Sequence, residues 1–274
     1  MKRFLALVFL LSGSANAIGQ TASNEDLIRK YKSQVESTRE ITDCGHAFDG
    51  PAYVVKQAEN NTLDRLLVLT EKQKAEIGKQ NYVQLQKNNK FLKKHKDLAK
   101  LNEIFKKLLS RTQGSKTTFS LHLIESKEIT AFTTIGGYVY VSTGLLDFIR
   151  SYDELAFILG HEIGHQLNRH MERKILKISM VSRFLSFADM ESFTKMATDV
   201  NNVVRAPFDQ MDEYEADKYG FEIAKSCGYD PQRFSDFFIR MEKYENTKII
   251  DKLKSTHPFS KNRRACLENY LSKK

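Results

Sequence analysis

The stretch Gly160-His161-Glu162-Ile163-Gly164-His165 decides how the rest of the chain is interpreted, because it contains the pattern HExxH. Histidines at positions i and i+4 of a helix lie on one face, so both imidazoles can reach one Zn²⁺ while Glu162 acts on a water molecule. A helix is expected here, since Ser151 and Glu154 form a capping-box signature before an apolar periodic run. The alternative is an ordinary amphipathic helix with two surface histidines.

A catalytic zinc site needs a third protein ligand, and the segment Met211–Gly220 offers one. Glu213 and Asp217 are one helical turn apart, so one helix face presents a ligand carboxylate and a second carboxylate for a histidine ring nitrogen. An acidic run is more often a solvated helix face. Its place about fifty residues after HExxH, in an E-x-x-A-D pattern, favours the metal site.

These two segments resemble the gluzincin metallopeptidases of the HtpX and CaaX-prenyl-protease type, including their soluble periplasmic BepA-like branch. The segment Ile129–Leu146 and the segment from Thr256 to Arg263 resemble the same family, in the same order along the chain. The resemblance covers about Thr118 to Leu271. Its small departures, at Thr130 and at Thr134-Ile135, affect the substrate cleft and leave the zinc-site residues unchanged.

The resemblance implies a role for each residue of the site. His161, His165 and Glu213 would hold one Zn²⁺ per chain, with Glu162 as the general base. Asp217 would orient His161, and His257 with Arg263 would lie near the developing oxyanion. An extended peptide would add as a strand beside the residues that border the cleft, which are Gly136, Gly137 and Tyr138. A buried structural strand is the alternative for these three residues.

The resemblance and the pattern of elements predict an α+β, mainly helical, zincin-like metallopeptidase fold with a small antiparallel sheet, an active-site helix and C-terminal helices. Residues 117–125, 128–134 and 138–143 alternate and are expected to be strands. One or two long helices are expected over 55–111, and a loop over 189–207 between the two zinc-binding helices.

Residues 1–17 have the three parts of a secretory signal: the basic Lys2 and Arg3, a short apolar segment, and Ala15-Asn16-Ala17 as a cleavage site. We therefore expect export across the inner membrane and a soluble periplasmic chain that begins at Ile18. A buried N-terminal helix is the alternative. The remaining chain is divided into an N-terminal helical extension, 18–111, and a zinc metallopeptidase domain, 112–274.

The formal net charge is +9, and the segment 87–111 carries nine basic residues against two acidic ones. A solvated helix face explains this segment better than nucleic-acid binding, because no nucleic-acid motif accompanies it. Peripheral contact with an anionic membrane surface stays open, as does the oligomeric state.

The chain has three cysteines, and export to an oxidising compartment favours a disulfide. We expect Cys227 to pair with Cys266, since both lie in the catalytic half, and Cys44 to stay free. The alternatives are that Cys44 pairs instead, or lies near the zinc as an inhibitory thiolate.

These observations predict a zinc-dependent endopeptidase that acts on polypeptides, such as unfolded or misassembled envelope proteins. The main alternative is a zinc-containing periplasmic chaperone with little or no proteolysis, which would not need Glu162 as a base. Hydrolysis of a non-peptide bond and nucleic-acid binding through the basic segment are further alternatives.

Overall fold

The computed structural model describes residues 23–37, 50–112, 115–181, 190–244, 247–258 and 260–272. The predicted signal peptide, 1–17, and Cys44 lie outside these residues. The described chain is mainly helical with one small sheet, which confirms the predicted α+β class. Its elements are α2 (Asn24–Ser37), α3 (Pro51–Leu66), α4 (Glu71–Asn88), α5 (Leu98–Leu109), β1 (Ser120–Ile124), β2 (Ala131–Thr134), β3 (Tyr138–Ser142), α6 (Thr143–Phe148), α7 (Tyr152–Leu167), α8 (His170–Val181), α9 (Met190–Thr198), α10 (Val200–Val203), α11 (Gln210–Ser226), α12 (Pro231–Lys243), η2 (Lys248–Ile250), α13 (Asp251–Thr256) and α14 (Ser260–Ser272).

The sheet is mixed, with the strand order β1–β3–β2. β2 and β3 form an antiparallel hairpin whose turn contains Gly136 and Gly137, and the φ values of 86° and 83° explain the two glycines. β1 runs parallel to β3, with Ser120 opposite Tyr138. The prediction of a wholly antiparallel sheet is therefore wrong for this pair, because β3 returns between β1 and β2 and runs in the direction of β1.

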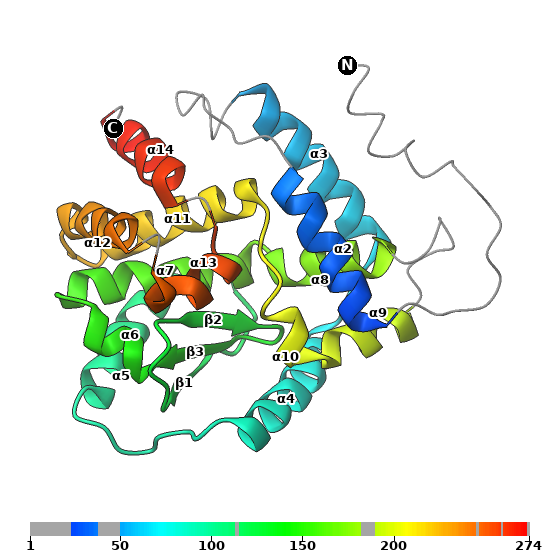
Figure 1. Cartoon of the computed structure of the whole chain (residues 1–274), viewed down its shortest axis with the longest axis horizontal. Helices are drawn as coiled ribbons and strands as arrows, with labels where there is room; N and C mark the ends of the chain where they lie inside the picture. The colour runs from blue at the N-terminus through cyan, green and yellow to red at the C-terminus, as the bar shows by residue number, and fades with distance from the viewer. Residues whose placement is uncertain are drawn as a thin grey trace.

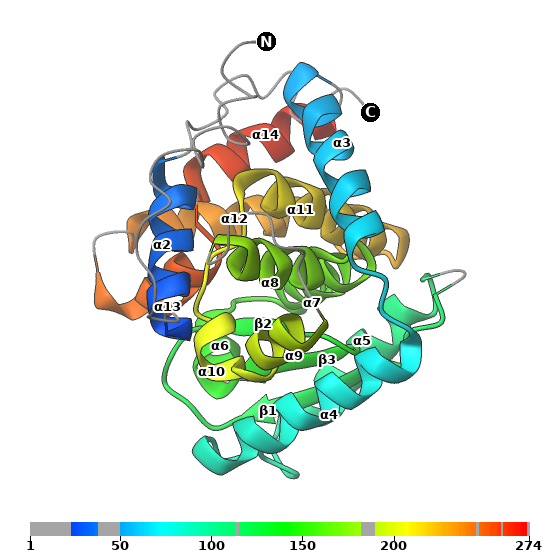
Figure 2. The same ribbon diagram turned by 90° about the vertical axis from the view of Figure 1, so that its right-hand side faces the viewer.

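Helix α7 lies between the sheet and α11, so the centre of the molecule is built in layers (Figure 1; Figure 2). The helix begins where predicted, since the Ser151 side chain accepts a hydrogen bond from the Glu154 backbone N–H at 3.3 Å. Every residue from 154 to 166 is buried. A surface helix with two exposed histidines is thereby excluded.

Two glycines allow α7 and α11 to approach closely. A Cβ atom on Gly220 would lie 2.7 Å from the backbone nitrogen of His161, and one on Gly160 would lie 2.9 Å from the Cα atom of Gly220. Contacts this short exclude any side chain at the crossing. The crossing places the first turn of α11, which carries Glu213, beside the histidines of α7.

The segment 55–111 forms three helices instead of the predicted one or two. Thr70 starts α4 with a capping box, because its side chain accepts from the Gln73 backbone N–H at 3.2 Å. After α4 the chain is extended, and the Leu92 N–H donates to the Leu123 carbonyl of β1 at 2.9 Å. This pairing is with a strand about thirty residues away, so local periodicity gave no sign of it.

The predicted loop over 189–207 is also wrong, because the described part of it is largely helical, as α9 and α10. Phe193 and Met196 are buried where α9 packs against α8 and α4. Each helix is short, which explains why a longer period was not visible in the sequence.

Cys227 is a free, buried thiol whose Sγ atom lies 3.4 Å from the Lys107 carbonyl oxygen. The predicted Cys227–Cys266 disulfide is therefore wrong: Cys227 packs into the core beside α5, whereas Cys266 packs with Met211 and Tyr214. Among the described helices, none is long and apolar enough to cross a membrane.

Candidate metal centre

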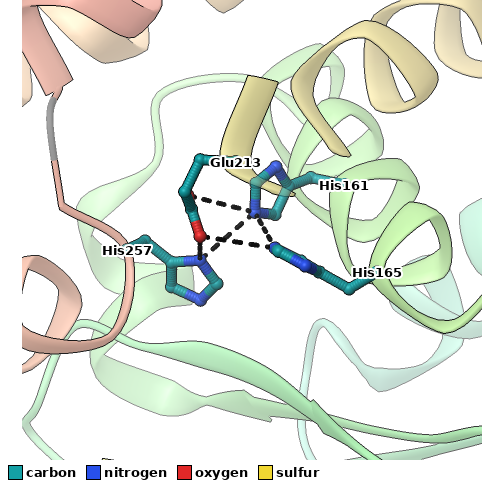
Figure 3. Close-up of side chains that lie close together, drawn as sticks. All are labelled: His161, His165, Glu213 and His257. Atoms are coloured by element: carbon teal, nitrogen blue, oxygen red, sulfur yellow. Dashed lines mark hydrogen bonds and ion pairs between the residues drawn. The ribbon is translucent and has the colours of Figure 1, made fainter. Parts of the chain in front are cut away.

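Four buried side chains converge on one point: His161 and His165 of α7, Glu213 of α11, and His257 just after α13 (Figure 3). The Nε2 atoms of His161 and His165 are 2.9 Å apart, and His257 Nδ1 lies 3.2 Å from His161 Nε2. Glu213 Oε1 lies 3.0 Å from His257 Nδ1 and 3.5 Å from His165 Nε2. None of the four residues is more than 4% exposed.

The spacing of these atoms fits a single zinc ion. Four donors at zinc–ligand distances of about 2.0–2.1 Å would be about 3.3 Å apart in a tetrahedron. The distances given above run from 2.9 to 3.5 Å, and His161 Nε2 lies 3.8 Å from Glu213 Oε2. The centre can therefore hold one tetrahedral divalent ion.

The hydrogen bond between His161 and Asp217 leaves the other ring nitrogen of His161 facing the cluster. Its Nδ1 atom lies 2.8 Å from Asp217 Oδ1, and a carboxylate only accepts, so Nδ1 carries the proton. His161 Nε2 then turns a lone pair toward the cluster. Burial lowers the pKa of His165 well below its usual value, which keeps its imidazole neutral. Facing lone pairs and a carboxylate repel each other unless a cation lies between them.

Glu162 stands beside the cluster with one oxygen available. Its Oε2 atom is buried and has no hydrogen-bond partner among the described residues, and its Oε1 atom lies 3.5 Å from His257 Nε2. Burial raises the pKa of the Glu162 carboxyl, against the opposing effect of His257 and His161. A space of about 30 Å³, lined also by Ala131 and Phe157, adjoins it and has room for a water molecule.

Arg263 of α14 binds the two carboxylates of α11. Its Nε and Nη2 atoms donate to Asp217 at 2.7 and 2.6 Å, and its Nη1 atom lies 2.6 Å from Glu213 Oε2. Burial alone would raise both carboxyl pKa values, but the guanidinium together with the neighbouring histidines holds the pKa of Glu213 and of Asp217 below the usual range. Both carboxylates are therefore ionised, as a metal ligand and a histidine partner must be.

His257 presents Nδ1 to the cluster and so takes the place of a fourth ligand, whereas the resemblance implied a place near the oxyanion. Burial lowers the pKa of His257, but the carboxylates of Glu213 and Glu162 together raise it by more. Four protein donors make a closed site of the structural kind, whereas a catalytic zinc keeps one position open.

A family model described as Peptidase family M48 matches residues 95–271, which is more than half of the chain and includes all four donors and Glu162. The chain belongs to peptidase family M48. Membership in this metal-dependent family agrees with the buried donor set of His161, His165, Glu213 and His257.

Known relatives of this M48 chain are metalloendopeptidases and related proteases. It is 30% identical over 182 residues to the mitochondrial metalloendopeptidase OMA1 of Schizosaccharomyces pombe. The aligned residues make up 65% of this chain and 54% of that protein. It is 27% identical over 183 residues to the beta-barrel assembly-enhancing protease of Escherichia coli. Here the aligned residues make up 62% of this chain and 38% of that protein. The match to the Arabidopsis thaliana mitochondrial metalloendopeptidase OMA1 is 31% over 140 residues, or 49% of this chain and 28% of that protein. The M48 chain thus matches about half the length of these relatives or less.

The hairpin turn of the M48 chain packs against other parts of the structure. A Cβ atom on Gly136 would lie 2.6 Å from the Lys74 carbonyl oxygen of α4, and the Gly137 N–H donates to Gln166 Oε1 at 3.2 Å. Tyr138 stacks on Tyr82 of α4 with ring centroids 5.7 Å apart. Gly136, Gly137 and Tyr138 follow the last residue of β2. The first residue of β2, Ala131, instead lines the space beside Glu162.

Sequence reasoning missed several residues of the M48 site on the side of His165. Phe208 stacks on the His165 ring with centroids 3.9 Å apart, and Lys174 Nζ lies 3.8 Å from the centroid of Phe208. Burial lowers the pKa of Lys174 to about 7. His170 lies against the other ring nitrogen of His165. A third histidine five residues after HExxH was the only available signal, and helical spacing does not put it on the same face.

Proposed function

We propose that this M48 chain is a zinc-dependent endopeptidase. The observation that carries the proposal is the buried convergence of three ligands, His161, His165 and Glu213, beside a glutamate whose Oε2 atom has no described partner. Imidazole and carboxylate donors at tetrahedral spacing suit zinc. The family and the relatives' names support hydrolysis of peptide bonds.

The residues around the centre have different roles in hydrolysis. His161, His165 and Glu213 would hold zinc, which when bound supplies a Lewis acid for the scissile carbonyl and acidifies water near neutral pH. Glu162 accepts the proton of the attacking water and delivers it to the departing amine. Its raised pKa suits both transfers, because a catalytic group works best when its pKa is near the operating pH.

His257 must leave the cluster before peptide hydrolysis, because substrate and water need the fourth position. It follows α13, a helix of six residues, and the Arg263 Nη1 atom reaches its carbonyl oxygen at 3.4 Å. A withdrawn His257 ring would stand beside the carbonyl oxygen of the substrate, as the resemblance implies. The closed arrangement also favours a second candidate function, a zinc-containing chaperone that holds polypeptides without cutting them.

We propose polypeptide substrates that bind in extended form along β2. Among the described strands, β2 pairs with β3 alone, and its first residue, Ala131, lines the space beside Glu162. Backbone pairing to a strand edge gives affinity without a strict sequence requirement. Such binding suits unfolded or misassembled envelope proteins, and the name of the Escherichia coli relative refers to beta-barrel assembly.

We also propose that the protein is exported and acts in the periplasm, in line with the BepA-like branch. The three-part pattern of residues 1–17 supports export. The basic residues of α4 and α5 would permit peripheral association with an anionic membrane surface.

The proposal is tested by comparing the parent protein with Glu162→Gln in digestion of casein and of an unfolded outer-membrane protein. Loss of about 10²–10⁴-fold in rate is expected, because a general base contributes that much. Metal content should be unchanged. Glu103→Gln, an exposed glutamate on α5, is the matched control. Equal digestion by Glu162→Gln and the parent would refute the role of Glu162.

His257→Ala separates the two candidate functions. An endopeptidase should digest both substrates in the parent, and His257→Ala should keep zinc through His161, His165 and Glu213 while digestion slows, because no ring would stand beside the carbonyl oxygen of the substrate. A chaperone would digest neither substrate in the parent or in His257→Ala, and would instead slow the aggregation of the unfolded protein equally well with and without Glu162.

A further inference from the structure

His165 is held in place by a hydrogen bond to another histidine, His170. Its Nδ1 atom lies 2.9 Å from Nδ1 of His170, and His170 Nε2 lies 3.0 Å from Glu215 Oε2. The carboxylate only accepts, so His170 carries its proton on Nε2 and accepts at Nδ1. His165 then donates from Nδ1 and turns the lone pair of Nε2 toward Glu213. This order of donors fixes the tautomer that a metal ligand needs.

A sharp turn between α7 and α8 brings His170 to this place. Arg169 has a φ of 59°, a left-handed conformation that is uncommon for a residue with a side chain. Its guanidinium donates to the Leu67 carbonyl at 3.0 Å and lies 3.2 Å from Asp64 Oδ1. Both partners belong to the end of α3 and the residue after it, so the N-terminal segment holds the turn.

Helix α3 also holds the outer end of the chain of hydrogen bonds. Gln57 donates to Glu215 Oε1 at 2.6 Å, and Lys56 lies 2.9 Å from Asp212 Oδ1 and 2.6 Å from Asp209 Oδ2. Lys56 is only 5% exposed. Helix α3 lies beside α8 and α11 (Figure 2) and precedes the segment matched by the family model, 95–271.

A second metal ion does not explain this cluster. His170, Asp212 and Glu215 have ligand atoms within 4.8 Å of one another. However, the cationic Lys56 already pairs with Asp212, Gln57 with Glu215, and His165 with the other nitrogen of His170. The donors are therefore used within the protein, and the cluster acts on His165.

We infer that His170, held by Glu215 and by Gln57 of α3, is a positioning residue that orients His165 for metal binding, so that the N-terminal helix α3 completes the support of the metal centre. The inference rests on the proposed function in that it concerns the same ion. It predicts that loss of the His170 acceptor weakens metal binding without any change in the four donors.

The test is the affinity for Zn²⁺, measured by chelator competition, together with the visible absorption spectrum of the Co²⁺-loaded protein. His170→Phe keeps the ring and removes both hydrogen bonds. His170→Asn keeps one acceptor and one donor. We expect about 10–100-fold weaker Zn²⁺ binding and an altered Co²⁺ spectrum in His170→Phe, with substantial recovery in His170→Asn. His95→Gln, a histidine near Asp97 on the loop before α5, is the matched control and should bind as the parent does.

Parental affinity in His170→Phe, or equal weakness of His170→Asn and His170→Phe, would overturn the inference. If His170→Phe does not fold, Glu215→Leu breaks the chain of hydrogen bonds at its next member and should weaken binding several-fold; unchanged affinity there would also overturn it. A parent that binds Zn²⁺ and digests nothing would refute the proposed function alone. A parent that digests casein while His170→Phe binds Zn²⁺ normally would refute the inference alone.

Discussion

The two histidines of the HExxH pattern are one turn apart on α7, yet the structure supports them in different ways. His161 is held directly by Asp217, which lies on the same helix as Glu213 and is fixed by Arg263. His165 is held through His170 and then Glu215, with helix α3 at the far end. The first support is short and charged, and the second is longer and depends on a segment outside the matched family region.

This difference predicts which substitutions harm the centre most. The support of His161 places a guanidinium between two buried carboxylates, so removal of one member breaks hydrogen bonds between buried charged groups. The support of His165 ends in Gln57, a neutral donor to the Glu215 carboxylate, and the loss of this hydrogen bond leaves no cation unpaired and should cost less.

The largest effect is expected from Asp217→Ala. It should lower the free energy of unfolding by about 3–5 kcal/mol at most, because Arg263 loses two buried hydrogen bonds to a carboxylate and keeps only Glu213, and weaken metal binding by about 10–100-fold. Urea unfolding and chelator competition measure the two effects. Asp236→Ala, which removes the exposed partner of Arg233, is the control and should cost about 1 kcal/mol or less. Equal effects of the two variants would remove the basis of the comparison.

Lys174→Met tests the surroundings of His165 through pH. Burial lowers the Lys174 pKa from 10.5 to about 7, so between these values the unfolded chain binds a proton that the folded chain does not. The stability of the metal-free parent should therefore rise with pH across this window. Lys174→Met should remove the rise and be more stable than the parent below pH 7, by about 1–4 kcal/mol.

The melting temperature of chelator-treated protein between pH 6 and 10 gives the answer. Lys106→Met, at an exposed lysine of α5, should keep the slope of the parent. An unchanged slope in Lys174→Met would show that this lysine is charged in the folded protein throughout.

The smallest effect is expected from Gln57→Leu, which removes the last hydrogen bond of the support of His165. A hydrogen bond to a carboxylate has a net value of about 1.5–3 kcal/mol. This one acts on the metal only through Glu215, His170 and His165, so Zn²⁺ binding should weaken by less than about 10-fold. Chelator competition measures it. If Gln57→Leu weakened Zn²⁺ binding as much as Asp217→Ala does, α3 would be as important to the metal centre as α11.

The sequence was most informative where function imposes a fixed local spacing. The pairs His161 and His165, and Glu213 and Asp217, are each four residues apart, and helical geometry brings each pair to one face. The predicted start of α7 was also correct, because the hydrogen bond that caps the helix joins Ser151 to Glu154, only three positions later. These predictions needed no knowledge of the rest of the fold.

The sequence was least informative where contacts join distant residues. The bond from Gln57 to Glu215 spans 158 positions, and the parallel pairing of β1 with β3 depends on how the hairpin inserts. Neither leaves a periodic signal. The Cys227–Cys266 pairing failed for the same reason, since proximity in the catalytic half does not determine that two side chains meet.

The central claim is that His161, His165 and Glu213 hold one divalent ion, and the metal content of the folded protein tests it most directly. Protein purified without chelator should contain about one zinc per chain, and Glu162→Gln should contain the same amount, since Glu162 is not a ligand. His165→Ala should lose most of the metal. A folded parent without any transition metal, or a His165→Ala variant that retains zinc at the parental level, would contradict the account.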